Sequence, residues 1–106
     1  MAEIAAASQT ATIGTEHTLA TATTFGTYIL LVDVANMVND DVLELRAKIK
    51  ARAAEAAVKT IYEVTLKHVQ NFPIVASIPI LGSAVEFTLK QTAGTGRAFP
   101  WSVNFA

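Results

Sequence analysis

The segment from Leu43 to Arg52 alternates apolar and charged side chains one by one, and this pattern constrains the fold more than any other feature of the chain. Leucine, alanine or isoleucine stands at every odd position, and glutamate, arginine or lysine at every even one. A helix would spread these charges around its circumference, whereas a strand puts all of them on one solvated face. A helix is the alternative, because these residues are good helix formers and the alanine-rich stretch 53–57 follows. The alternation predicts a strand, with 52–57 as either a hairpin loop or a helical turn.

The same period of two returns five more times, between segments rich in turn-forming residues. The expected strands are Thr27–Val34, Lys59–Val69, Ile74–Ile80, Val85–Lys90 and Phe99–Phe105. Pro79 marks a sheet edge or a strand end. The side chains expected to face the core are Tyr28, Leu30, Val32, Val34, Tyr62, Val64, Leu66, Ile74, Ala76, Ile78, Ile80, Val85, Phe87, Leu89, Phe99, Trp101, Val103 and Phe105. Short strands at this spacing, with no helical segment between them, predict an all-β fold: an antiparallel β-sandwich, with a jelly roll as one form of it.

Residues 1–24 differ from the rest, because they are almost entirely alanine, threonine, serine, glycine and isoleucine. Such a segment buries little area to offset the entropy lost on ordering. It is either a frayed terminus or an extended arm that orders on a sheet edge of a neighbouring subunit. We therefore divide the chain into an N-terminal arm, 1–24, and a β-sandwich domain, 25–106. The residues expected to touch a partner are Ile4, Thr10, Thr12 and Ile13 in the arm, and Arg97 at a turn.

Composition limits the classes of partner. The chain is 52% hydrophobic and 16% charged, against about 45–50% and about 25% in average domains. Either part of the surface is covered by another molecule, or the excess is alanine that adds little area. A net charge of −1 predicts no nucleic-acid partner, and no apolar run is long enough for a membrane span. Glu3 stands where a signal peptide needs a basic residue, which predicts synthesis in the cytoplasm.

Candidate catalytic and metal-binding residues are few, and we predict no catalytic, cofactor or metal site. The chain has no cysteine, and its two histidines, His17 and His68, lie far apart in sequence without clustered carboxylates. Asp33, Asp40 and Asp41 lack the spacing of a calcium loop, and we expect Asp40 and Asp41 to bond nearby backbone N–H groups. The serines, Ser8, Ser77, Ser83 and Ser102, stand in no nucleophile motif.

Three further features have a structural and a functional interpretation. Gly94-Thr95-Gly96-Arg97 lacks the lysine and helix of a phosphate-binding loop and is typical of a hairpin turn. The aromatic face around Trp101 is expected to be core, with a carbohydrate platform as the alternative. The charged face of 43–52, opposite Lys59, Glu63 and Lys67, is expected to be solvated, with docking of an acidic partner as the second interpretation.

Two stretches resemble structural proteins of tailed bacteriophages. These are Leu31–Arg46 (LVDVANMVNDDVLELR), as a strand–turn–strand element, and Phe87–Val103 (FTLKQTAGTGRAFPWSV). The resemblance implies a β-rich virion protein and transfers no functional residues. Among such proteins, capsid decoration (cement) proteins tend to be small, cysteine-free β-modules that form trimers and bridge capsomers with terminal arms.

The first hypothesis is therefore a non-enzymatic decoration protein of the phage head. Its expected partners are copies of itself, as a homotrimer, and the major capsid protein or another virion protein. The second is a binding module of the tail, neck or fibre, touching a host glycan through exposed aromatic rings at Trp101 or Tyr28. A small enzyme comes third, because the sequence offers no convergent set of ionisable groups.

Overall fold

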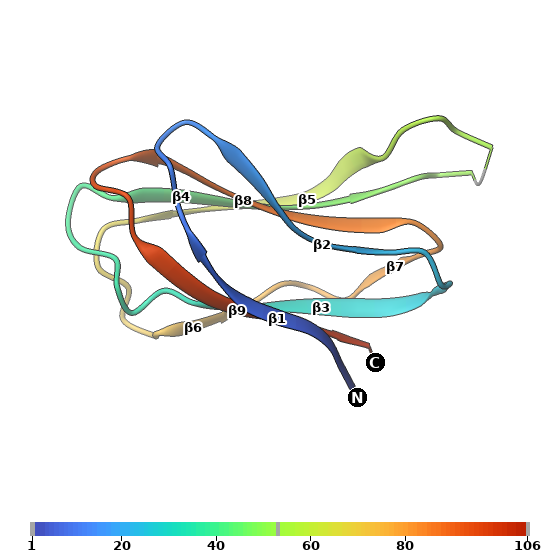
Figure 1. The fold of residues 1–106 in the computed structure, drawn as a ribbon, viewed down its shortest axis with the longest axis horizontal. Helices are drawn as coiled ribbons and strands as arrows, with labels where there is room; N and C mark the ends of the chain where they lie inside the picture. Colours follow the sequence, from blue (N-terminus) through green and yellow to red (C-terminus); the bar gives the residue numbers. More distant parts are fainter. Residues whose placement is uncertain (1, 53, 106) are drawn as a thin grey trace.

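The described residues of the chain form nine β-strands arranged in two layers (Figure 1). The computed structural model describes residues 2–52 and 54–105, and within these ranges it contains no helix. The strands are β1 (Ala2–Thr10), β2 (Glu16–Ala22), β3 (Gly26–Asp33), β4 (Val42–Ile49), β5 (Lys59–Lys67), β6 (Ile74–Ala76), β7 (Ile80–Gly82), β8 (Val85–Ala93) and β9 (Ala98–Phe105). The prediction of an all-β sandwich is confirmed.

Two antiparallel sheets face each other. In the first, called sheet A, the order is β1-β9-β3-β6, with β7 also paired to β3. In the second, sheet B, the order is β2-β8-β4-β5. The pairing is nested: the first strand pairs with the last, β2 with β8, β3 with β6 and β7, and β4 with β5. This is the topology of a jelly roll in which one strand is broken into β6 and β7.

The core lies between the sheets and is built by the alternation seen in the sequence. Tyr28, Leu30 and Val32 are buried on β3, while the residues between them are half-exposed. Burying an aliphatic or aromatic side chain of this size contributes about 1.5–3 kcal/mol. The other fully buried apolar side chains come mainly from β4, β8 and β9: Leu43, Leu45, Ala47, Val85, Phe87, Leu89, Phe99 and Val103.

The strand predicted for Leu43–Arg52 exists, and its odd residues through Ala47 are buried as expected. It ends at Ile49, three residues earlier than predicted. The connection to β5 contains a turn in which Glu55 N–H donates to Arg52 C=O at 3.1 Å. Among the described residues of this connection there is no helix, so the hairpin-loop interpretation holds.

The strand predicted for Ile74–Ile80 is wrong in two respects. It is broken after Ala76, and Ile74, Ala76 and Ile78 face solvent instead of the core. Ile80 is buried as expected, at the start of β7. The break resets the alternation, because residues 77–79 do not continue the ladder and Pro79 has no N–H to donate.

The segment predicted to be an arm contains two extended stretches that add to sheet edges of their own chain. Residues 2–10 form β1 beside β9, and 16–22 form β2 beside β8. Both lie at the ends of their sheets, and Ala2 of β1 pairs with Phe105 of β9. Whether this segment also contacts a neighbouring subunit stays a prediction.

Candidate interaction surface

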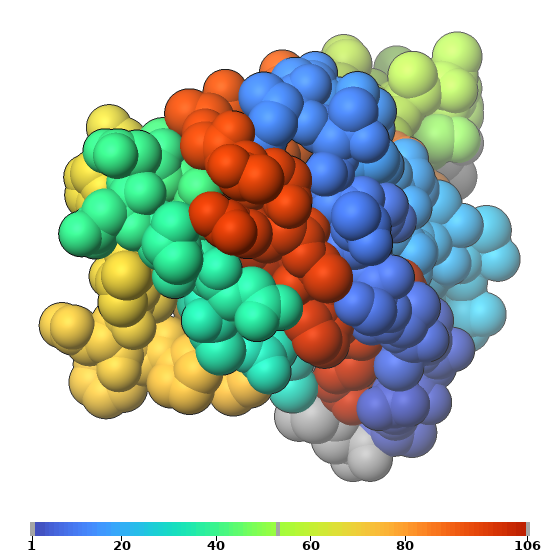
Figure 2. Space-filling model, turned by 60° about the vertical axis from the view of Figure 1, so that its left-hand side comes forward, coloured from blue at the N-terminus to red at the C-terminus, as the bar shows by residue number. Residues whose placement is uncertain are grey.

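A stretch of seventeen residues, 69–85, has no ionisable side chain, and we call it the uncharged segment. It lies between His68 and Glu86 and contains β6 and β7. Because both strands pair with β3 on its outer side, the segment forms one edge of sheet A. Figure 2 shows part of it, in yellow, along the margin of the molecule beside β3, opposite the blue β1. It is the longest stretch of the chain without an ionisable side chain.

The uncharged segment exposes large apolar side chains. Phe72 is 78% exposed and Ile74 is 55% exposed. Three more side chains in the segment are at least half exposed: Val69, Ile78 and Leu81. Single exposed apolar residues are ordinary on protein surfaces, but a group of them without charge is typical of an interaction site. We did not predict from the sequence that these side chains are exposed, although the lack of any ionisable residue over 69–85 was a signal for it.

The break between β6 and β7 determines how this edge can bind a partner. Ser77 N–H donates to the Leu30 carbonyl at 2.8 Å, and the Leu30 N–H donates to Ser77 Oγ at 2.9 Å. The serine hydroxyl thus takes the place of a strand carbonyl, which explains its position without any nucleophilic role. Pro73 and Pro79 interrupt the free backbone edge, so strand addition is disfavoured there. Contacts at this edge would be made by side chains.

The outer face of sheet B has the opposite character, because it is covered by a network of ion pairs. Arg46 contacts Glu16, Glu44 and Glu63, with N–O distances of 3.1, 2.6 and 3.3 Å. Lys48 contacts Glu16 at 3.0 Å. The sequence predicted a solvated charged face built from 43–52 and β5, and β2 adds Glu16, an acid that local patterns could not place there. With Arg46 and Lys48 paired internally, docking of an acidic partner loses its main support.

Glu16 is the acid that joins three strands on this face. Burial alone would raise the pKa of its carboxyl, but hydrogen bonds from Lys48, Thr88 and Arg46 lower that pKa to about 2. The Thr88 hydroxyl donates to Glu16 Oε2 at 2.8 Å. The carboxylate therefore fixes the edge strand β2 to β8 and β4.

The residues predicted to touch a partner fall into two groups. Ile4, Thr10, Thr12 and Ile13 are exposed on β1 or in the loop after it. Arg97 lies close to this loop, because its carbonyl accepts from Ala11 N–H at 2.8 Å. The guanidinium of Arg97, however, contacts Asp41 of its own chain. The structure thus brings Thr10, Thr12 and Ile13 to the corner beside Arg97 and gives Arg97 an internal partner. Ile4 lies toward the other end of β1, between the pairs Glu3–Asn104 and Ala5–Val103.

Asp41 is buried and holds that corner together. Its Oδ2 accepts from Arg97 Nε and from Val38 N–H, both at 3.0 Å, and its Oδ1 accepts from Thr95 N–H at 3.3 Å. Burial raises the pKa of this carboxyl, but the hydrogen bonds from Val38, Arg97 and Thr95 outweigh it and leave the pKa lowered. The turn role predicted for Asp41 is confirmed. The pair also connects the stretches 31–46 and 87–103, which contain Asp41 and Arg97 respectively.

Two neighbours complete this corner. Gly94 has φ near +90°, and a Cβ there would overlap Asp41, so this position requires glycine. The buried Gln91 amide donates to the carbonyls of Ala93 and Thr95, and its oxygen accepts from Arg97 N–H. The hairpin interpretation of 94–97 therefore agrees with the structure. The backbone groups of this loop bond to Asp41 and Gln91.

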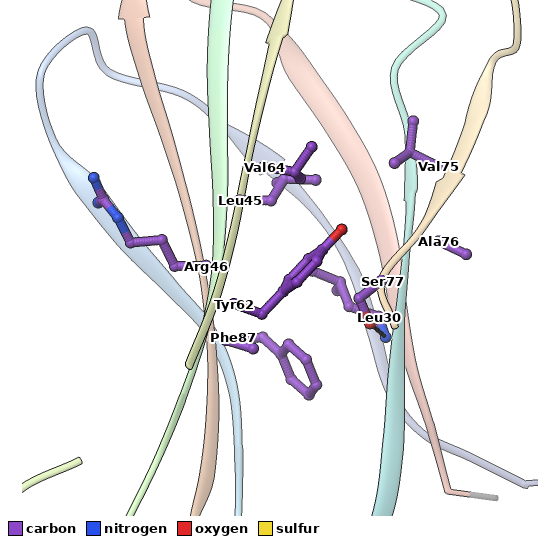
Figure 3. Close-up of a pocket in the computed structure, with 10 residues that line it drawn as sticks. Leu30, Leu45, Arg46, Tyr62, Val64, Val75, Ala76, Ser77 and Phe87 are labelled. Carbon is purple, nitrogen blue, oxygen red and sulfur yellow. Dashed lines mark hydrogen bonds between the residues drawn. The ribbon is translucent and has the colours of Figure 1, made fainter. Parts of the chain in front are cut away.

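Small-molecule binding has little support from the interior. A cavity of about 10 Å³ lies between the sheets, near Tyr62, Phe87 and Ser77 (Figure 3). Figure 3 shows Tyr62 and Phe87 between the sheets and Arg46 pointing away from them. A volume of about 10–15 Å³ is needed for one water molecule, and ligand pockets span about 300–1,000 Å³. The cavity is therefore far too small for a ligand.

The aromatic rings considered for glycan stacking belong to the core or pack against it. Tyr28 is 2% exposed, and its ring meets Phe105 edge-on at 5.2 Å. Trp101 is half-buried and packs against the core cluster. The core interpretation of the last strand is confirmed by Phe99 and Val103, which are fully buried.

Within residues 2–52 and 54–105, no group of three or more histidine, aspartate or glutamate side chains could hold a metal ion. The same ranges contain no helix long and apolar enough to cross a membrane. Comparison of the chain with protein-family models, with curated proteins and with solved structures gave no match.

Proposed function

We propose that this chain is a non-enzymatic structural protein of a phage particle, a decoration protein that binds the capsid and copies of itself. The observation that carries the proposal is the uncharged segment, where five large apolar side chains are at least half exposed. Left in water, such side chains favour association, because covering them contributes about 25 cal/mol per Å² of apolar surface. The proposed homotrimer would cover this edge.

Two further observations support the proposal. The topology is that of a jelly roll, an architecture used by viral capsid proteins, although lectins and cupins share it and fold alone does not fix function. The stretches 31–46 and 87–103 resemble phage structural proteins and meet through the Asp41–Arg97 ion pair. Many modest contacts repeated over one particle would sum to strong attachment.

The proposal is tested on particles purified from the source of the chain. Mass spectrometry should find the chain at a fixed ratio to the major capsid protein, and particles stripped of it should rupture at lower temperature. Re-added wild-type protein should restore the rupture temperature, and the double variant F72D/I74D should not. If the chain is absent from purified particles, the proposal is wrong. If its copy number matches that of tail components instead of the major capsid protein, the chain is a tail protein.

A matched control comes from β5. Ile61 is exposed to the same extent as Ile74, 56% against 55%, and also lies on an edge strand, but outside the uncharged segment. I61D should therefore rebind like wild type. If I61D loses as much rebinding to stripped particles as F72D/I74D, an acid at any exposed apolar position has the same effect. The uncharged segment would then have no special role in attachment.

A further inference from the structure

Strand β1 is joined to its own chain almost entirely by backbone pairing. None of the described residues of β1 belongs to the hydrophobic core, which begins along the chain at Ala11. Only Ala5 and Gln9 are half-buried, and the other β1 side chains are exposed. By contrast, β2 packs Leu19, Ala20 and Ala22 against the core. The core is therefore complete without residues 2–10.

The ladder between β1 and β9 also has two weak points. The register shifts between Glu3 and Ala5, so one residue there is unpaired. Farther along, Ser8 lies opposite Pro100, which has no N–H to donate. Such a ladder can open at low free-energy cost, because few side-chain contacts are lost with it.

The chain is anchored directly after β1, so β1 can pivot without disturbing the rest. Ala11 is buried, and its N–H donates to the Arg97 carbonyl at 2.8 Å. Gly14 N–H donates to the Gln91 carbonyl at the same distance. These bonds hold the loop to the corner around Asp41 and leave a pivot at Thr10. When β1 swings away, the edge of β9 is left open over residues 98–105.

We propose that β1 is an exchangeable strand: in the assembly, residues 2–10 of one copy lie on β9 of the next copy, in the register seen within one chain. The fit of this segment to that edge is shown by the intramolecular pairing itself. Exchange keeps every backbone pair and changes only the pivot, which makes it a low-cost route to association. Mutual exchange around three copies would close a ring.

The inference rests on the proposed self-association, and a disulfide experiment separates the two. Ala6 and Ser102 are register partners on the outer face of sheet A, and the chain has no native cysteine. Paired strand residues have Cα atoms about 4.5–5.5 Å apart, within disulfide range. An A6C chain and an isotope-labelled S102C chain are refolded together and oxidised. Exchange predicts a disulfide-linked heterodimer as the main cross-linked product.

The control and the opposing result use the same chains. The control mixes S8C with S102C. Ser8 is a diagonal neighbour of Ser102 on that face, so their Cα atoms would lie about 7–8 Å apart and little heterodimer should form. The double variant A6C/S102C in one chain confirms that the register forms. If its disulfide is entirely intramolecular and the mixed chains give no heterodimer, exchange is wrong. Light scattering on the same samples shows whether the chain self-associates. If it self-associates without the heterodimer, strand exchange is wrong and the proposed function is unaffected.

Discussion

Asp41 is the residue on which most of one end of the sandwich depends. It receives hydrogen bonds from the β3–β4 turn, from the β8–β9 turn and from Arg97, while its own backbone carbonyl accepts from His68 N–H after β5. A buried carboxylate is tolerated only when it is paired and hydrogen-bonded. Asp41 therefore fixes the relative positions of loops that belong to both sheets.

We expect Asp41→Asn to lower the free energy of unfolding by about 3 kcal/mol, because it leaves Arg97 without its charged partner in a largely buried site. Asp40→Asn is the matched control: Asp40 is exposed, and its positive φ suits asparagine. That control should change stability by less than about 0.5 kcal/mol. Urea unfolding followed by Trp101 fluorescence measures both variants. Equal losses in the two would contradict the role given to Asp41.

Glu16 gives the fold a dependence on pH. Its pKa is about 2 in the folded chain, against 4.5 ordinarily. A lowered folded-state pKa contributes stability that is fully present above about pH 4.5 and is lost as the pH falls toward 2. Glu16→Gln should therefore flatten the plot of urea midpoint against pH in this window. Glu3→Gln, outside the ion-pair network, should leave the plot unchanged. If the urea midpoint of Glu16→Gln depends on pH in the same way as that of the wild type, the ion-pair network around Glu16 does not stabilise the fold.

At the scale of elements, the sequence predicted strands well where each alternates one core face with one solvated face. β4 and β8 are such strands, and inward residues such as Leu45 and Phe87 were identified from period two alone. The prediction failed at 74–80, because a break resets the alternation without changing the composition. Nor could it place Glu16 beside Arg46, since that contact joins residues 30 positions apart. The local pattern of a strand predicts which of its side chains face the core. It does not predict which distant strand will lie beside it, because that depends on the tertiary fold.

Deleting residues 2–10 should leave the sandwich folded, because β1 contributes no side chain to the core among its described residues. The thermal midpoint, followed by far-UV circular dichroism, should fall only slightly. Phe99→Ala in the neighbouring strand β9 should cost about 3–5 kcal/mol, since Phe99 is fully buried. An unfolded truncated chain would show that β1 is integral to the fold and would remove the basis for strand exchange.

The whole molecule presents two unlike surfaces. The outer face of sheet B is covered by paired charges, while the uncharged segment exposes apolar side chains along the edge of sheet A. Paired charges keep one face solvated, and the free energy of the system falls when the exposed apolar side chains of the other are removed from water. This asymmetry is what a protein needs if it attaches to a large particle by one side and remains soluble on the other.

Mass by light scattering over a range of concentrations tests the central claim most directly, that the uncharged segment mediates association. Wild-type protein and I61D should both show a multiple of the 11.3 kDa chain mass. I74D and F72D/I74D should shift toward the monomer while keeping the wild-type circular dichroism spectrum. A wild-type chain that stays monomeric at every concentration, or an F72D/I74D variant with the wild-type mass, would contradict the account.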